Sequence, residues 1–284
     1  MQIDNDNPER RKVLSAVKTA LDSTCQLYQW EDESTEQFVA NGCAVLFSHG
    51  ANYYCLSNAH VLADAQLGKT FFVLGNRFQM TVGGDMWFSV PYDSTARNND
   101  FLDFAIVKLS HAVARHLLDD GRVFLRLNQF QTISSLGAGD ILLLAGYPAS
   151  KFEIDRQTNR IKFAPFMCRT IPYLSEVKIK EFNRGLHHII QFPIASFRET
   201  TTRQRMRAPQ PHGMSGSGLW LLEQSHPDEN PIPILIGLLA EYHENQAVMI
   251  SSKIDLFLDV IRQEFDQSLP NDGIRLDIEK LSPE

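Results

Sequence analysis

The sequence predicts an all-β protein with a helix near each end, and two observations support this fold class. Between residues 36 and 251, short apolar runs alternate with turn-forming residues, which is the pattern of antiparallel strands. Helical spacing of apolar residues is confined to the two ends of the chain. Many short strands with few helices between them are typical of a β-sandwich or a β-barrel.

The N-terminal segment is predicted to begin with a helix. Asn7 suits a helix cap and Pro8 suits the first helical position. Apolar residues then recur at helical spacing from residue 13 to residue 21. We expect residues 1–35 to form a helical extension that packs on the outside of the strands.

The strands are expected in order along the middle of the chain. Their apolar runs are residues 39–47, 53–56, 71–74, 86–90, 104–109, 141–145, 161–166, 188–192, 219–222, 232–239 and 247–250. Residues 150–185 and 198–212 are charged or weakly periodic, so we expect long surface connections there. After residue 252 helical spacing returns, and the last fifteen or so residues resemble a tail.

The overall charge and the cysteines restrict the class of partner. The chain has 27 Lys and Arg against 34 Asp and Glu, a formal net charge of −7, so we expect no nucleic-acid partner. No signal-peptide core and no membrane-spanning run is evident, so we expect no membrane association and a cytoplasmic location. The four cysteines lie far apart, without the short spacings of a zinc site. We therefore expect reduced thiols and no bound metal.

Two segments in the first half of the chain carry chemically distinctive residues. An apolar run ends at residue 56, and His60 follows it within a turn of small residues. On its own, such a histidine is more often a structural residue than a catalytic one. Asp103 lies inside the apolar run 101–107, where an ionised carboxylate costs several kcal/mol unless it is satisfied. Asp103 is thus expected either at a strand edge, facing solvent or hydrogen-bonded to local backbone, or in the core, where it orients an imidazole.

A third distinctive segment is residues 211–220, in which Gly213 and Gly216 flank Ser215. Glycines permit positive φ and let a substrate approach closely. Such a loop can aim the backbone N–H groups of Gly213 and Ser215 at one point, which is what an oxyanion hole requires. An ordinary Gly/Ser turn between strands is the alternative. The chain order His60, Asp103, Ser215 is one of the known orders of the acyl-transfer triad, with Ser215 as nucleophile, His60 as general base and acid, and Asp103 fixing the His60 tautomer.

These segments resemble the trypsin/chymotrypsin-like serine protease superfamily, in particular bacterial trypsin-like peptidase domains. The matching stretches are residues 43–46, 57–60, 98–109 and 213–218, with weaker similarity at 146–148 and 236–240. The resemblance implies two six-stranded antiparallel barrels, at residues 36–128 and 129–251, with the triad in the cleft between them. A C-terminal helix and tail would follow at residues 252–284.

Three positions depart from that family. Secreted members carry, immediately before the nucleophile, an Asp that pairs with the new N-terminus after zymogen cleavage, but this chain has Met214 there. Its pocket must therefore be preformed, or be ordered by substrate or by a partner. Val61 replaces a cysteine whose disulfide braces the histidine loop, and Ser217 replaces the second glycine after the nucleophile.

The family's substrate pocket is expected next to Ser215. Its base lies six residues before the nucleophile, at Pro209, so the acidic base that binds Arg or Lys is absent. Ala240, Glu241 and Tyr242 are expected in the wall. Tyr242 would make the pocket shallow, whereas Glu241 would supply a charge, and the sequence leaves both open.

The function we expect is a serine endopeptidase that hydrolyses protein or peptide substrates through an acyl-enzyme, without a cofactor. Restricted specificity or an activating protein partner is a further expectation, because unregulated proteolysis inside a cell is harmful. One alternative is a catalytically silent protease-fold module that binds peptides or a partner protein. An α/β-hydrolase is disfavoured, because its Gly-x-Ser-x-Gly motif ends here in Ser217 and its histidine would come last.

Overall fold

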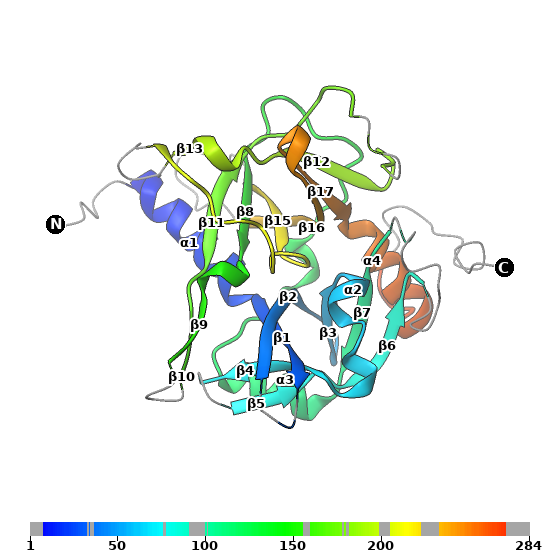
Figure 1. Ribbon diagram of the computed structural model, residues 1–284. Coiled ribbons are helices and arrows are strands. Elements are labelled where there is room, and N and C mark those ends of the chain that lie inside the picture. Colours follow the sequence, from blue (N-terminus) through cyan, green and yellow to red (C-terminus); the bar gives the residue numbers. More distant parts are fainter. Residues whose placement is uncertain are drawn as a thin grey trace.

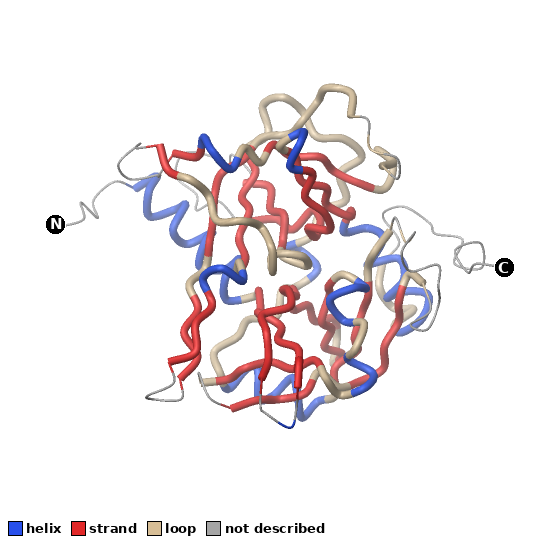
Figure 2. Tube along the Cα trace, viewed as in Figure 1, coloured by secondary structure: helices blue, strands red, loops and turns tan. Residues whose placement is uncertain are grey.

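The computed structural model describes residues 8–32, 34, 37–75, 78–90, 100, 102–155, 160–177, 179, 182–198, 205–222 and 233–270. Two curled antiparallel sheets dominate these residues, and they form the two lobes seen in Figure 1 and Figure 2. The predicted fold class is confirmed, since the chain is mostly β and has the chymotrypsin-like arrangement of two half-barrels with a few short helices.

The first sheet has seven strands in the order β5-β4-β1-β2-β3-β7-β6. Their bounds are β1 (Thr24–Asp32), β2 (Gln37–His49), β3 (Asn52–Ser57), β4 (Thr70–Leu74), β5 (Phe78–Thr81), β6 (Gly84–Phe88) and β7 (Ala105–Leu109). β2 and β3 form a tight hairpin that ends with His49 opposite Asn52. This hairpin leads directly into the segment that carries His60.

β1 lies in a segment that was expected to belong to the N-terminal extension. It pairs antiparallel with β2, from Thr24 opposite Val45 to Asp32 opposite Gln37. Both Leu27 and Tyr28 are buried, so the tertiary structure covers both faces of the strand. Glutamines interrupt the apolar pattern of this segment, which hid the strand in the sequence. β1 also makes this a seven-stranded sheet, where six strands were expected.

The second sheet has six strands, as expected, in the order β11-β8-β15-β16-β17-β12. Their bounds are β8 (Leu142–Gly146), β11 (Phe166–Thr170), β12 (His187–Gln191), β15 (Gly218–Leu222), β16 (Pro233–His243) and β17 (Val248–Lys253). Two small ladders pair β9 (Phe152–Asp155) with β10 (Arg160–Phe163) and β13 (Phe197–Arg198) with β14 (Arg205–Met206). The stretches expected as long connections thus contain short strands.

The helices lie mainly at the ends of the described chain. α1 (Pro8–Asp22) and α4 (Ile254–Val260) are the expected terminal helices, and α4 continues as a π-helical turn (Ile261–Phe265). α2 (Ala59–Leu62) and α3 (His111–Asp119) belong to the first lobe. Short 3₁₀ turns occur at Ala65–Leu67, Leu127–Gln129, Ala149–Lys151, Ile194–Ser196 and Glu244–Gln246. The expected cap Asn7 and the expected tail at 271–284 lie outside the described residues.

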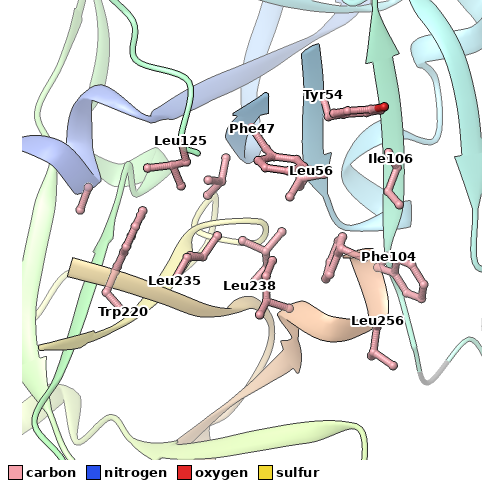
Figure 3. Close-up of a cluster of buried hydrophobic side chains, with 14 of the residues drawn as sticks. Phe47, Tyr54, Leu56, Phe104, Ile106, Leu125, Trp220, Leu235, Leu238 and Leu256 are labelled. Carbon is pink, nitrogen blue, oxygen red and sulfur yellow. The ribbon is translucent and has the colours of Figure 1, made fainter. Parts of the chain in front are cut away.

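A shared hydrophobic core joins the two lobes (Figure 3). The first lobe contributes Phe47, Leu56 and Phe104, and the second lobe contributes Trp220 and Leu238. Side chains of α1 and α4 belong to the same cluster, while each sheet encloses a further core of its own. Truncating one of these buried aromatic side chains to Ala costs roughly 3–5 kcal/mol. The core therefore fixes the position of one lobe relative to the other, and with it any site at their junction.

Candidate active site

His60 is presented by the short helix α2 at the end of β3. Ala59, Val61 and Leu62 are fully buried and anchor this helix in the core of the first lobe. The His60 side chain points the other way and is 46% exposed. A single turn with three buried residues thus holds one imidazole at the surface of the lobe.

Asp103 binds His60 at two points. Its Oδ2 lies 2.6 Å from Nδ1 of His60, and its Oδ1 accepts a hydrogen bond of 3.0 Å from the His60 backbone N–H. The Asp103 side chain is only 13% exposed. An ionised carboxylate can only accept, so Nδ1 carries the proton and Nε2 is left as the basic nitrogen. Of the two positions expected for Asp103, the structure gives the one that orients an imidazole.

The backbone of Asp103 adopts a left-handed conformation with φ of 41°, which is uncommon for a residue other than glycine. Two side chains hold it there. The Asn58 amide donates to the Asp103 carbonyl at 2.8 Å, and the Asp103 N–H donates to the Asp100 carboxylate at 3.0 Å. These bonds offset the cost of the strained backbone and fix the direction of the Asp103 side chain.

Asp100 is the centre of this supporting network. Its carboxylate also accepts from the Leu102 N–H at 3.1 Å and from the Ser89 hydroxyl, and Ser89 Oγ in turn accepts from the Phe104 N–H at 3.1 Å. Burial raises the pKa of Asp100, and the hydrogen bond from Ser89 opposes that shift. Sequence reasoning missed Asp100 and Asn58. The available signals were a second carboxylate three residues before Asp103 and a polar residue at the buried end of β3.

Ser215 lies in the loop that leads into β15, and this loop is bonded to both sheets. The Ser215 carbonyl accepts from the Cys43 N–H of β2 at 2.7 Å, and the Gly216 N–H donates to the Leu239 carbonyl of β16 at 2.8 Å. The Ser215 hydroxyl donates to the Ala240 carbonyl at 3.5 Å, the long limit of a hydrogen bond. The loop is therefore held tightly while the hydroxyl is held weakly.

Two glycines show how closely the Ser215 loop approaches the segment of His60. A Cβ at Gly42 would lie 2.6 Å from the Val61 methyl groups and 3.0 Å from the Ser215 carbonyl oxygen. A Cβ at Gly216 would lie 2.5 Å from the hydroxyl of Ser57, at the end of β3. The Ser215 loop thus packs on the strand ends that carry His60. His60 and Asp103 are in direct contact. The Ser215 loop meets the same segment through the close packing at Gly42 and Gly216.

The two backbone N–H groups expected to form an oxyanion hole, those of Gly213 and Ser215, lie in the loop before β15. Gly213, with φ of 82°, occupies a turn closed by a 2.9 Å bond from the Met214 N–H to the Pro211 carbonyl. Within the described residues, the N–H groups of Gly213 and Ser215 donate to no other atom. Unpaired donors beside a nucleophile are what a developing oxyanion requires.

A pocket of about 290 Å³ adjoins Ser215. Ala240, Glu241 and Tyr242, three of the four residues expected to form it, belong to its lining. Pro209, the fourth, is not among the lining residues, whereas the next residue in the chain, Gln210, is.

The pocket wall contains both apolar bulk and charge. Tyr242 and Met249 face each other as cross-strand partners on β16 and β17, and both line the pocket. Glu241 Oε2 lies 2.9 Å from Nε2 of His243. The carboxylate is half exposed, so water screens its charge. The bulky Tyr242 and the charged Glu241, which the sequence left open as alternatives, therefore occur in the same wall.

In the part of the chain that the structure describes, no group of three or more His, Cys, Asp or Glu side chains lies close enough to hold a metal ion. None of the helices in this part of the chain is long and apolar enough to cross a membrane. All four cysteines are buried and have free thiols.

Comparison with known proteins gives structural likeness without sequence-level matches. No protein-family model matches the chain, and no curated protein matches it. The solved structures that it resembles include proteases. They are a Glu endopeptidase (14% identity, 82% of this chain and 85% of that chain, TM-score 0.41), the serine endoprotease of Yersinia pestis (16%, 88% and 65%, 0.47), and a thermostable serine protease from an extremophilic microorganism (11%, 88% and 98%, 0.46). At these identities the likeness concerns the fold.

Proposed function

We propose that this chain is a serine endopeptidase with Ser215 as nucleophile, His60 as general base and acid, and Asp103 as the residue that orients His60. The observation that carries the proposal is the meeting of three features at one junction. These are the His60 and Asp103 pair, the Ser215 loop, in which two N–H groups have no acceptor among the described residues, and a pocket of about 290 Å³ beside Ser215.

The geometry supports an acyl-enzyme mechanism. Ser215 Oγ attacks the peptide carbonyl carbon while His60 Nε2 takes the hydroxyl proton, and Asp103 stabilises the resulting imidazolium. The N–H groups of Gly213 and Ser215 hold the oxyanion. When the intermediate collapses, the C–N bond breaks and His60 gives its proton to the leaving amine. Water activated by His60 then hydrolyses the ester and regenerates Ser215.

A peptide is the substrate that this site suits. The pocket beside Ser215 is open and lined by both apolar and polar groups, as expected for a side chain next to the cleaved bond. We also propose that the protein acts inside the cell, with narrow specificity or under the control of a protein partner. Rapid and indiscriminate cleavage of unfolded casein by the purified protein would contradict that restriction.

A catalytically silent module is the less favoured alternative. Asp103 has a strained backbone, and its largely covered carboxylate and its backbone each make two polar contacts; this arrangement has a cost in stability that a peptide-binding surface alone does not need. That cost is explained if Asp103 orients a catalytic base.

Labelling with a fluorophosphonate probe tests the proposed function. Wild type should be labelled, and Ser215→Ala and His60→Ala should not. Ser217→Ala is a matched control, because it removes a buried hydroxyl from the same loop and should leave labelling intact. Labelling of Ser215→Ala, or a wild type that neither reacts with the probe nor cleaves peptides, would reject the assignment.

A further inference from the structure

The peptide between His212 and Gly213 is fixed from outside the loop. The His212 carbonyl accepts a hydrogen bond of 2.8 Å from the Ala149 N–H, at the start of the 3₁₀ turn Ala149–Lys151. The described chain contains no cis peptide bond, and in a trans peptide the C=O and N–H groups point in opposite directions. Binding of the carbonyl by Ala149 therefore turns the Gly213 N–H away from Ala149.

Ala149 also packs closely against Gly213, so the hydrogen bond to the His212 carbonyl holds the peptide in its present orientation. A Cβ at Gly213 would lie 2.7 Å from the Ala149 nitrogen and 2.9 Å from its Cβ. Rotating the 212–213 peptide by half a turn would break the bond to Ala149 and replace the Gly213 N–H by a carbonyl oxygen. One donor would then become an acceptor, which repels an oxyanion.

Met214 holds the same loop from the inside. Its side chain is 1% exposed and belongs to the core of the second sheet, with Leu144, Phe192 and Leu219. Its backbone closes two successive turns, because its N–H donates to the Pro211 carbonyl and its carbonyl accepts from the Ser217 N–H, both at 2.9 Å. An Asp at this position would bury a charge in an apolar cluster.

Cys43 adds a third contact from the first sheet. Its Sγ lies 3.3 Å from the Gly213 carbonyl oxygen. Burial raises the pKa of Cys43 to about 11, so the group is a neutral thiol that donates to that carbonyl at physiological pH. The carbonyls of His212 and Gly213 are thus both bonded, while the Gly213 N–H has no acceptor among the described residues.

We propose that Ala149 and Met214 are positioning residues that keep the oxyanion hole formed, by a backbone hydrogen bond and an apolar anchor, without a charged switch or cleavage of the chain. This inference rests on the proposed function. It assigns to the segment after β8 and to one buried methionine the role that an Asp paired with a new N-terminus has in secreted relatives of the family that the sequence resembles.

Ala149→Pro tests the hydrogen bond, with Ala149→Gly as its matched control. Proline suits the first position of a helical turn but has no N–H, whereas glycine keeps the donor. If one oxyanion donor is lost, kcat should fall by about 10²–10³-fold with KM nearly unchanged, and Ala149→Gly should stay close to wild type. Equal activity of the two variants would overturn the proposal.

Met214→Leu and Met214→Asn test the anchor. Leu keeps the apolar contacts and should preserve kcat, while Asn should lower it. Circular dichroism and thermal unfolding identify an Asn variant that fails to fold, and in that case the Ala149 pair still decides. Loss of kcat in Met214→Leu together with full activity in Ala149→Pro would contradict the assignment of both residues.

Amide hydrogen exchange gives a readout that does not depend on catalysis. In the wild type the Gly213 amide should exchange faster than the Ser217 amide, which donates to Met214. A protected Gly213 amide would reject the proposed device even if the protein cleaves peptides. An exposed Gly213 amide in a protein without activity would instead reject the proposed function and leave the loop geometry standing.

Discussion

The two halves of the candidate site are built by different kinds of interaction. In the first lobe, His60 and Asp103 are held mainly by side chains, with Asn58 and Asp100 bonded to the Asp103 backbone. In the second lobe, the loop of Ser215 is held mainly by backbone hydrogen bonds and by the buried side chain of Met214. The first half thus depends on side-chain chemistry, and the second half depends on backbone conformation.

Because of this difference, the two halves should tolerate different substitutions. In the first lobe, a change of one functional group removes a charge or an acceptor and should act on catalysis even when the shape is kept. In the second lobe, changes of side chain should matter only where they move the backbone. Substitutions in the two halves should therefore differ in the size of their effect.

Asp103→Asn should have the largest effect. Asparagine tolerates left-handed backbone, so the φ of 41° and the fold should be kept. Its amide can hold His60 in the wrong tautomer, and kcat should fall by about 10⁴-fold. Steady-state kinetics on a peptide substrate measure this, and thermal unfolding serves as the control. If Asp103→Asn keeps activity within a few-fold of wild type, the first half of the site does not depend on the charge of its side chains.

Asp100→Ala should lower kcat/KM by about 10²-fold, the order expected when a catalytic group is misplaced by about 1 Å. Asp100→Asn keeps an acceptor for the N–H groups of Leu102 and Asp103 and should restore most of the activity. Comparing the two variants separates the role of Asp100 as a hydrogen-bond acceptor from the role of its charge. If both variants lose activity equally, the charge of Asp100 acts directly and the supporting role is wrong.

The two lobes should also differ in how a histidine affects stability. His188 of the second lobe is buried near Lys253, whereas His60 of the first lobe is paired with the Asp103 carboxylate. Burial and nearby Lys253 lower the pKa of His188 to about 3. Between about pH 6.5 and pH 3 the unfolded chain binds a proton that the folded chain does not, so the free energy of unfolding should fall by about 1.4 kcal/mol per pH unit as pH falls.

Urea unfolding of wild type and His188→Gln from pH 7 to pH 4 measures this contribution. The variant lacks the imidazole, so its stability should fall less steeply with pH. Parallel curves for the two proteins would show that His188 takes up its proton without cost in the folded state.

Glu241→Gln should have the smallest effect, because the carboxylate is half exposed and paired with His243. The preference for Lys or Arg over an uncharged side chain before the cleaved bond should fall by about threefold, as expected for a screened charge. His243→Gln frees the carboxylate and should shift the ratio of kcat/KM values the other way. Shifts in the same direction for both variants would exclude Glu241 as the source of the preference.

Several features of this protein followed from residue pattern alone. The mixed texture of short apolar runs and turns predicted the β fold, and the interrupted apolar run at Asp103 indicated a carboxylate that needed a partner. The strand β1 did not follow, because its glutamines hide a segment whose two faces are covered only after folding. Pro209 was expected in the pocket from its spacing to Ser215 and is not among the lining residues; spacing along the chain does not give the path of a loop.

The fold class and the chemistry of the three residues proposed for catalysis follow from the chain alone, because apolar periodicity and side-chain type are properties of the sequence. The contact of Asp103 with His60 and the support of its strained backbone by Asp100 and Asn58 depend on folding, as do the Gly213 and Ser215 N–H groups, which have no acceptor among the described residues. A hydrogen-bond donor points where its peptide plane is held. In this chain that plane is held by Ala149, a residue far away in sequence with no functional group of its own.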